Sequence, residues 1–269
     1  MATSSARGPW WQKPSSPGIS AAASGGHVVF AKADGSLWAI GDNSRGQFGT
    51  GDNSNPKSPV EVLPSGVAAG NPSIFGYVLK SNGALLYQGA ATSHNNAGTT
   101  HATPGVYLPG GVMQVANPYL NLVYLKEDGS LWKQPHAESA QQLVSDGVAV
   151  VGSNGKSYHD LFIKEDGSLW AFGTNTNGQL GDGTTTDRED PVQVVDAEVA
   201  AVFAGAYYGQ GSSFFIKTDG SLWAMGRNYY GQLGDGSTED RHFPVKVLDD
   251  GVIAGITGSN HTLFLKEDG

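Results

Sequence analysis

The side chains best suited to bind a ligand are tyrosines in the C-terminal part of the chain, together with two polar neighbours. Tyrosine offers a rigid ring with a polar tip, and arginine offers a fork of hydrogen-bond donors, so both residue types are enriched at binding surfaces. The predicted binding residues of this group are Tyr207, Tyr208, Gln210, Arg227, Tyr229 and Tyr230. If the two segments that hold them meet in the fold, the four tyrosines form one aromatic patch.

A second candidate is the polar tract 89–105, which contains His94 and His101. This tract replaces a segment that is regular elsewhere in the chain, and departures from a repeat are common at binding loops. We include both histidines among the predicted binding residues. Drift of a degenerate repeat is the alternative explanation.

No residue pattern indicates catalysis, a metal or a cofactor. The chain has no cysteine, which excludes thiolate chemistry and cysteine-ligated zinc. His27, His159 and His261 occupy equivalent positions, eight residues before a glycine, and we interpret them as structural. The acidic tracts 181–190 and 235–244 lack the spacing of an EF-hand loop. We therefore predict no catalytic residue, no metal ligand and no cofactor.

These residues are carried by an internal repeat. Three segments have nearly the same sequence: GSLWAIGDNSRGQFGTG (35–51), GSLWAFGTNTNGQLGDG (167–183) and GSLWAMGRNYYGQLGDG (220–236). Two further segments, 81–89 and 127–135, keep only the first half of the pattern, and the chain stops at a sixth copy of its glycine. Internal repetition at this length is typical of stacked or circular architectures.

Each copy is predicted to be a β-hairpin. The hairpin glycines are residues 35, 83, 129, 167, 220 and 269. An Asp-Gly or Asn-Gly pair between two apolar runs favours a two-residue turn in which both residues have positive φ. The spacing of about 45 residues is typical of four-stranded propeller blades.

The sequence therefore predicts an all-β, six-bladed β-propeller that forms a single domain over residues 1–269, with a flexible tail at 1–7. Residues 8–14 resemble 130–135, a strand that the last copy lacks. We expect this N-terminal strand to pair with the C-terminal hairpin and close the ring, which removes two open sheet edges. An insertion at 206–211 is expected to form a loop near the channel mouth.

The pattern DGSLWAxGxNxxGQLGxG, followed by Pro-Val-x-Val, resembles the regulator of chromosome condensation repeat. The resemblance implies a β-propeller and several possible roles, because the family includes an exchange factor for the small GTPase Ran, an ultraviolet-B photoreceptor and an inhibitor of β-lactamases. A fold of this kind does not fix the function.

The composition of the chain limits the classes of partner that it could bind. The formal net charge is −9 and no Lys or Arg run is present, which disfavours nucleic acid. No apolar stretch approaches the ~18 residues of a membrane-spanning helix. We expect a non-enzymatic binding module for a protein, with a glycan as the second choice, and an extracellular or cell-surface location over a cytoplasmic one. A GTPase exchange factor and a propeller enzyme are the alternatives.

Overall fold

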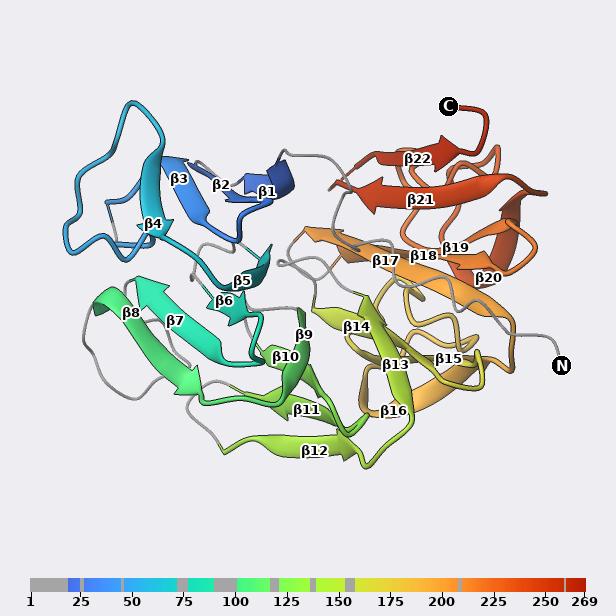
Figure 1. Ribbon diagram of the computed structural model, residues 1–269. Coiled ribbons are helices and arrows are strands. Elements are labelled where there is room, and N and C mark those ends of the chain that lie inside the picture. Colours follow the sequence, from blue (N-terminus) through green and yellow to red (C-terminus); the bar gives the residue numbers. More distant parts are fainter. Residues whose placement is uncertain are drawn as a thin grey trace, which may run out of the picture.

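The computed structural model describes residues 19–24, 27–44, 46–71, 77–89, 101–116, 121–135, 139–152, 158–207, 210–258 and 260–269. These residues form strands and turns without any helix, so none of the described segments is a helix that could span a membrane. Six antiparallel sheets follow one another around a common centre (Figure 1). The all-β prediction and the prediction of six blades are confirmed.

The first five sheets have four strands each, and the sixth has two within the described residues. The first sheet comprises β1 (Ile19–Ser24), β2 (His27–Lys32), β3 (Leu37–Gly41) and β4 (Val60–Leu63). The second comprises β5 (Val67–Asn71), β6 (Tyr77–Lys80), β7 (Leu85–Gly89) and β8 (His101–Leu108). The third comprises β9 (Val112–Ala116), β10 (Leu122–Lys126), β11 (Leu131–Gln134) and β12 (Gln141–Val144). The fourth comprises β13 (Val148–Gly152), β14 (His159–Lys164), β15 (Leu169–Gly173) and β16 (Arg188–Val195). The fifth comprises β17 (Val199–Tyr207), β18 (Gln210–Lys217), β19 (Leu222–Gly226) and β20 (Arg241–Leu248), and the sixth comprises β21 (Val252–Thr257) and β22 (Thr262–Lys266).

The first strand of each sheet lies nearest the centre. β13 contacts both β9 and β17, and β17 also contacts β21, so these strands line up around the axis. Small residues suit this crowded position: a Cβ on Gly152 would lie 2.4 Å from Val202 of the next sheet. The core lies between neighbouring sheets, where Leu161 and Ile163 pack with Val202 and Ala204.

The hairpin turns differ in type from the sequence prediction. Gly35 has a φ of 83°. Among the described residues, Glu198 is the only residue other than glycine with a positive φ, so the residue before Gly35 does not have one. The amide of Gly35 donates to the carbonyl of Lys32, and Ala31 pairs with Leu37. This is a three-residue connection in which glycine alone takes the left-handed conformation, the type I turn with a G1 bulge. The predicted two-residue turn with two positive φ values was wrong.

The predicted loop at 206–211 is also corrected. β17 extends to Tyr207 and β18 begins at Gln210, and these two residues pair with each other. The extra residues therefore lengthen a β-ladder between the innermost strand and the next strand. Backbone hydrogen bonds are satisfied more fully in a ladder than in an open loop, which favours this arrangement.

The predicted closing strand, residues 8–14, and the predicted tail, residues 1–7, lie outside the described residues. Within the described part of the chain, β22 pairs with β21 alone.

Candidate functional site

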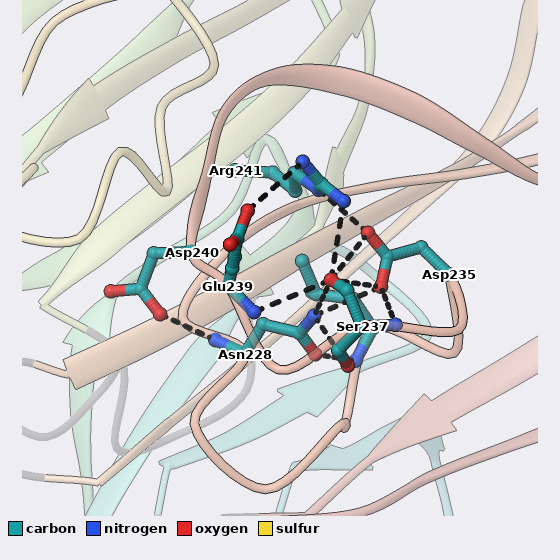
Figure 2. Close-up of polar contacts among 7 residues, drawn as sticks. Asn228, Asp235, Ser237, Glu239, Asp240 and Arg241 are labelled. Atoms are coloured by element: carbon teal, nitrogen blue, oxygen red, sulfur yellow. Dashed lines mark hydrogen bonds and ion pairs between the residues drawn. The ribbon is translucent and has the colours of Figure 1, made fainter.

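The loop after the third strand has the same framework in the first, fourth and fifth sheets. It is organised around a buried asparagine, which is Asn43, Asn175 or Asn228. In the fifth sheet the side-chain oxygen of Asn228 accepts a hydrogen bond from the amide of Leu233 at 3.0 Å, and its Nδ2 donates to Asp235 at 2.9 Å (Figure 2). The amide of Asn228 donates to Asp240 Oδ1 at 2.7 Å. The Gly-x-Asn spacing of the sequence therefore encodes a rigid loop.

Acidic side chains of this loop are held by internal partners. Arg241 Nε lies 2.6 Å from Asp235 Oδ2, and Ser237 also bonds the same carboxylate. Burial raises the pKa of the Asp235 carboxyl, but hydrogen bonds from Arg241, Ser237 and Asn228 outweigh it and lower the pKa to about 2. Arg188 holds Asp182 in the same way at 2.7 Å in the fourth sheet. These carboxylates are structural members of the loop.

Three side chains project from this framework in the fifth sheet, and we call Arg227, Tyr229 and Tyr230 the tyrosine–arginine patch. The two rings form an edge-to-face pair with centroids 4.9 Å apart, and they are 68% and 58% exposed. The guanidinium carbon of Arg227 lies 5.9 Å and 5.4 Å from the two ring centroids. At these distances the cation is attracted to both ring faces.

The backbone fixes the patch against two neighbouring segments. The amide of Arg227 donates to the carbonyl of Gly211 at 2.8 Å, and Ser212 Oγ donates to the carbonyl of Arg227 at 2.8 Å. These bonds place the patch beside the start of β18. Arg227 Nη1 also reaches Asn260 Oδ1, in the connection between β21 and β22, at 3.5 Å.

The glutamine of the Gly-Gln pair holds the second tyrosine. Gln232 Oε1 accepts the amide of Tyr230 at 2.9 Å, while the Gln232 carbonyl accepts the hydroxyl of Thr262, from β22, at 3.0 Å. The loop is thus tied to the next sheet as well as to its own.

Tyr230 differs from its equivalent in the fourth sheet. That residue is Asn177, whose Nδ2 donates to Asp240 of the fifth sheet at 2.8 Å. Tyr230 is instead 58% exposed.

The remaining predicted residues are placed less fully. Tyr207 and Gln210 face each other across the end of the β17–β18 ladder, as backbone partners. His101 begins β8 and pairs with Gly89. Tyr208 and His94 lie outside the described residues. The structure therefore brings Arg227, Tyr229 and Tyr230 together and places them next to the strand that begins at Gln210.

Two further exposed residues, Asn260 and Phe243, are not distinguished by the sequence pattern. Phe243 is 66% exposed and lies against Gly183 of the fourth sheet, where an added Cβ would be 2.3 Å from its ring. In a strand whose side chains alternate between two faces, the sequence does not show that this phenylalanine points outward. Asn260 lies one residue from the His261 position, and its reach toward Arg227 depends on how two sheets dock.

The equivalent histidines have a structural environment where they are buried. His159 is 1% exposed, and its Nε2 lies 2.8 Å from Ser213 Oγ of the next sheet. Burial lowers the pKa of His159 to about 4, so the ring is neutral at pH 7. No group of three His, Asp or Glu residues in the described part of the chain is arranged to hold a metal ion.

Two segments, residues 166–209 and 219–265, match the family model for the regulator of chromosome condensation (RCC1) repeat. The first segment starts at the hairpin turn of the fourth sheet and extends past β17, and the second starts at the hairpin turn of the fifth sheet and extends into β22. The second segment contains the whole tyrosine–arginine patch.

Curated relatives match over part of the chain. The E3 ubiquitin-protein ligase HERC2 of Mus musculus is 29% identical over 182 residues, which is 59% of this chain and 4% of that protein. The probable E3 ubiquitin-protein ligase HERC4 of Homo sapiens is 31% identical over 115 residues, 42% of this chain and 11% of that protein. The chain thus spans a small fraction of the length of these relatives.

Solved structures share the architecture. Human WBSCR16 has a TM-score of 0.73 at 18% identity, with 90% of this chain and 70% of that chain covered. Yeast RCC1 (Prp20) in its complex with Kap60 has a TM-score of 0.74 at 18% identity, with 93% and 68% covered. These likenesses confirm the propeller fold.

Proposed function

Because this chain carries regulator of chromosome condensation repeats, we propose that it is a non-enzymatic recognition module that binds a protein partner through the tyrosine–arginine patch. A propeller of this family is a binding or regulatory scaffold, and its specificity depends on the side chains that its loops present.

One observation carries the proposal. On a loop whose Asn228 and Asp235 side chains are held by internal hydrogen bonds, Tyr229 and Tyr230 expose 68% and 58% of their surface and are held edge to face beside an arginine. Two adjacent exposed rings form a contiguous surface that a partner can cover favourably. Tyrosine and arginine are also the residue types that contribute most to protein-binding hot spots.

Two comparisons support a protein over a glycan. Both are solved structures of yeast RCC1 (Prp20): in one it is bound to the protein Kap60, and the other was studied with its binding to Gsp1p and histones. Those partners belong to that protein. What we carry over is the class of partner, since the patch has the composition of a protein interface.

The test is the affinity of a captured partner for matched variants. The chain serves as bait in a lysate of its source, and the protein that binds is purified and titrated against the wild type and Tyr229→Ala/Tyr230→Ala. We expect the double variant to bind about 30-fold more weakly, the equivalent of about 2 kcal/mol.

The control is Val106→Ala, which shortens a side chain that is 68% exposed on the second sheet. It should bind like the wild type, and all three proteins should melt at the same temperature. Equal affinity of the wild type and a folded double variant would overturn the proposal.

A further inference from the structure

We propose that the patch recognises an acidic peptide segment: Arg227 receives a carboxylate, and Tyr229 and Tyr230 cover a neighbouring apolar or aromatic side chain. This inference rests on the proposed function and specifies the chemistry of the partner.

The arginines of the described residues differ in whether they form ion pairs. Among the described residues, Arg188 pairs with Asp182 at 2.7 Å and Arg241 pairs with Asp235 at 2.6 Å. Arg227 forms no ion pair with any described carboxylate, and its hydrogen bond to the Asn260 amide oxygen is long, at 3.5 Å. A guanidinium has five N–H donors, so most of the hydrogen-bonding capacity of Arg227 is available to a ligand.

The side chain of Arg227 has no part in the hydrogen-bonded framework of the loop. In the fourth sheet Thr174 stands at the same position, and its amide donates to the carbonyl of Tyr158 at 2.9 Å, just as the amide of Arg227 donates to Gly211. In the first sheet the position holds Asp42, which has the opposite charge. In the first sheet this carboxylate accepts the amide of Ser44 at 3.0 Å, so the side chain at this position differs in role between sheets, and the cation is a local addition of the fifth sheet.

The guanidinium of Arg227 is held in place before a ligand binds. Gly226 has a φ of 98°, and an added Cβ would lie 2.5 Å from the Gly211 carbonyl oxygen, so the chain preceding Arg227 is closely held. The two rings then lie beside the guanidinium at 5.9 Å and 5.4 Å. Positioning the fork before binding reduces the side-chain entropy lost when a carboxylate docks.

The net charge of the whole chain does not determine whether the patch prefers an acidic or a basic peptide. The chain carries a formal charge of −9, which would attract a basic peptide over the surface as a whole. Salt screens such long-range attraction beyond about 8–10 Å. At the patch itself a basic side chain would meet the Arg227 cation, whereas a carboxylate would form charge-assisted hydrogen bonds with it.

The experiment uses three fluorescent peptide pools that differ at two positions. Each pool carries two randomised apolar or aromatic residues, followed by Glu-Glu, Gln-Gln or Lys-Lys in an otherwise Gly-Ser sequence. Binding to the full chain is measured by fluorescence anisotropy. We expect the Glu pool to bind at least tenfold more tightly than the Gln pool, and the Lys pool to bind most weakly.

Variants of the chain test which residue causes the preference for the Glu pool. Arg227→Gln should remove the difference between the Glu and Gln pools, and Arg227→Lys should keep part of it because the charge remains while the planar fork is lost. Lys57→Gln removes one exposed positive charge from the first sheet and should leave the preference intact. Tyr229→Ala/Tyr230→Ala should weaken the Glu and Gln pools alike.

Three results would overturn the inference: no binding by any pool, tighter binding of the Lys pool, or an acidic preference that survives in Arg227→Gln. Each leaves the proposed function to be decided separately, by the affinity of the captured protein for the tyrosine double variant.

Discussion

His159 shows how a single buried residue joins two sheets of this propeller. Its ring is enclosed between the fourth and fifth sheets, with Ser213 at 2.8 Å, and Gly211 packs so closely that an added Cβ would lie 2.5 Å from the ring. The neutral form fits this site, because burial disfavours the charged ring. We therefore expect this residue to make folding stability depend on pH.

We predict that His159 destabilises the fold as the pH falls from about 6.5 to about 4. Its pKa is lowered from 6.5 to about 4 in the folded state, so the unfolded chain binds the extra proton in this range. The stabilising contribution is complete above pH 6.5 and is lost on acidification, by up to about 3 kcal/mol. The pKa of Asp235 is about 2, so the loss of its ion pair falls at lower pH.

The measurement is the urea midpoint of the wild type and His159→Asn between pH 7 and pH 4. Asparagine occupies the equivalent position of the third repeat, at residue 121. The wild type should lose stability more steeply than this variant, while His261→Asn, at an exposed position of the sixth sheet, should follow the wild type. Parallel curves for all three proteins would show that His159 is not the sensitive group.

At the scale of elements, the hairpin glycines link each sheet to the next. Gly220 has a φ of 82°, its carbonyl accepts the amide of Val252 at 3.0 Å, and an added Cβ would lie 2.8 Å from the amide nitrogen of Gly251. Gly236 has nearly the same φ, 81°, but an added Cβ would meet nothing within 4 Å. Comparing substitutions at these two glycines therefore separates the cost of a positive φ from the cost of steric contact.

We therefore predict that Gly220→Ala is more destabilising than Gly236→Ala. Left-handed backbone costs about 1–2 kcal/mol for a residue with a Cβ, and this cost applies to both variants. Only Gly220→Ala also pushes the turn away from the following sheet, and Gly220→Val should lose more still. Denaturant unfolding gives the values, and equal losses in the two alanine variants would mean that the turn relaxes without cost.

The same elements show what the sequence could predict. Hairpin positions and the repeat period were predictable because they depend on glycine spacing within a few residues. The turn type was not, because Asp-Gly suits both a two-residue turn and a type I turn with a G1 bulge. Tyr229 and Tyr230 stood out as two aromatic residues where the sibling loops hold polar ones, Ser44 and Arg45 or Thr176 and Asn177. Their meeting with Arg227 and Asn260 depends on the docking of three segments, which local sequence does not encode.

At the scale of the whole molecule, the sixth sheet differs from its siblings. Leu263, Phe264 and Leu265 are 64%, 46% and 49% exposed, whereas the equivalent residues of β14, Leu161, Phe162 and Ile163, are at most 4% exposed. In the fourth sheet, β15 pairs with β14 and the fifth sheet packs against it. The described part of the sixth sheet has neither neighbour, so a substantial apolar surface is uncovered.

We predict that residues 8–14 cover part of this surface as the missing strand. Deleting residues 1–17 should then lower the melting temperature and increase the binding of a hydrophobic dye, because it uncovers an apolar sheet edge. Trp10→Ser/Trp11→Ser keeps the backbone of the segment and should have a smaller effect. A truncated chain that melts like the full chain would show that this segment does not close the ring.

Photocrosslinking tests most directly whether this repetitive scaffold binds its partner through a non-repetitive contact surface. A photoreactive benzoylphenylalanine is placed at position 229 or, as a comparison, at position 106, and each chain is irradiated with the captured partner. We predict an efficient crosslink from position 229, which maps to an acidic segment of the partner, and little from position 106. Efficient crosslinking from position 106 with none from position 229, in a chain that still binds, would contradict the account.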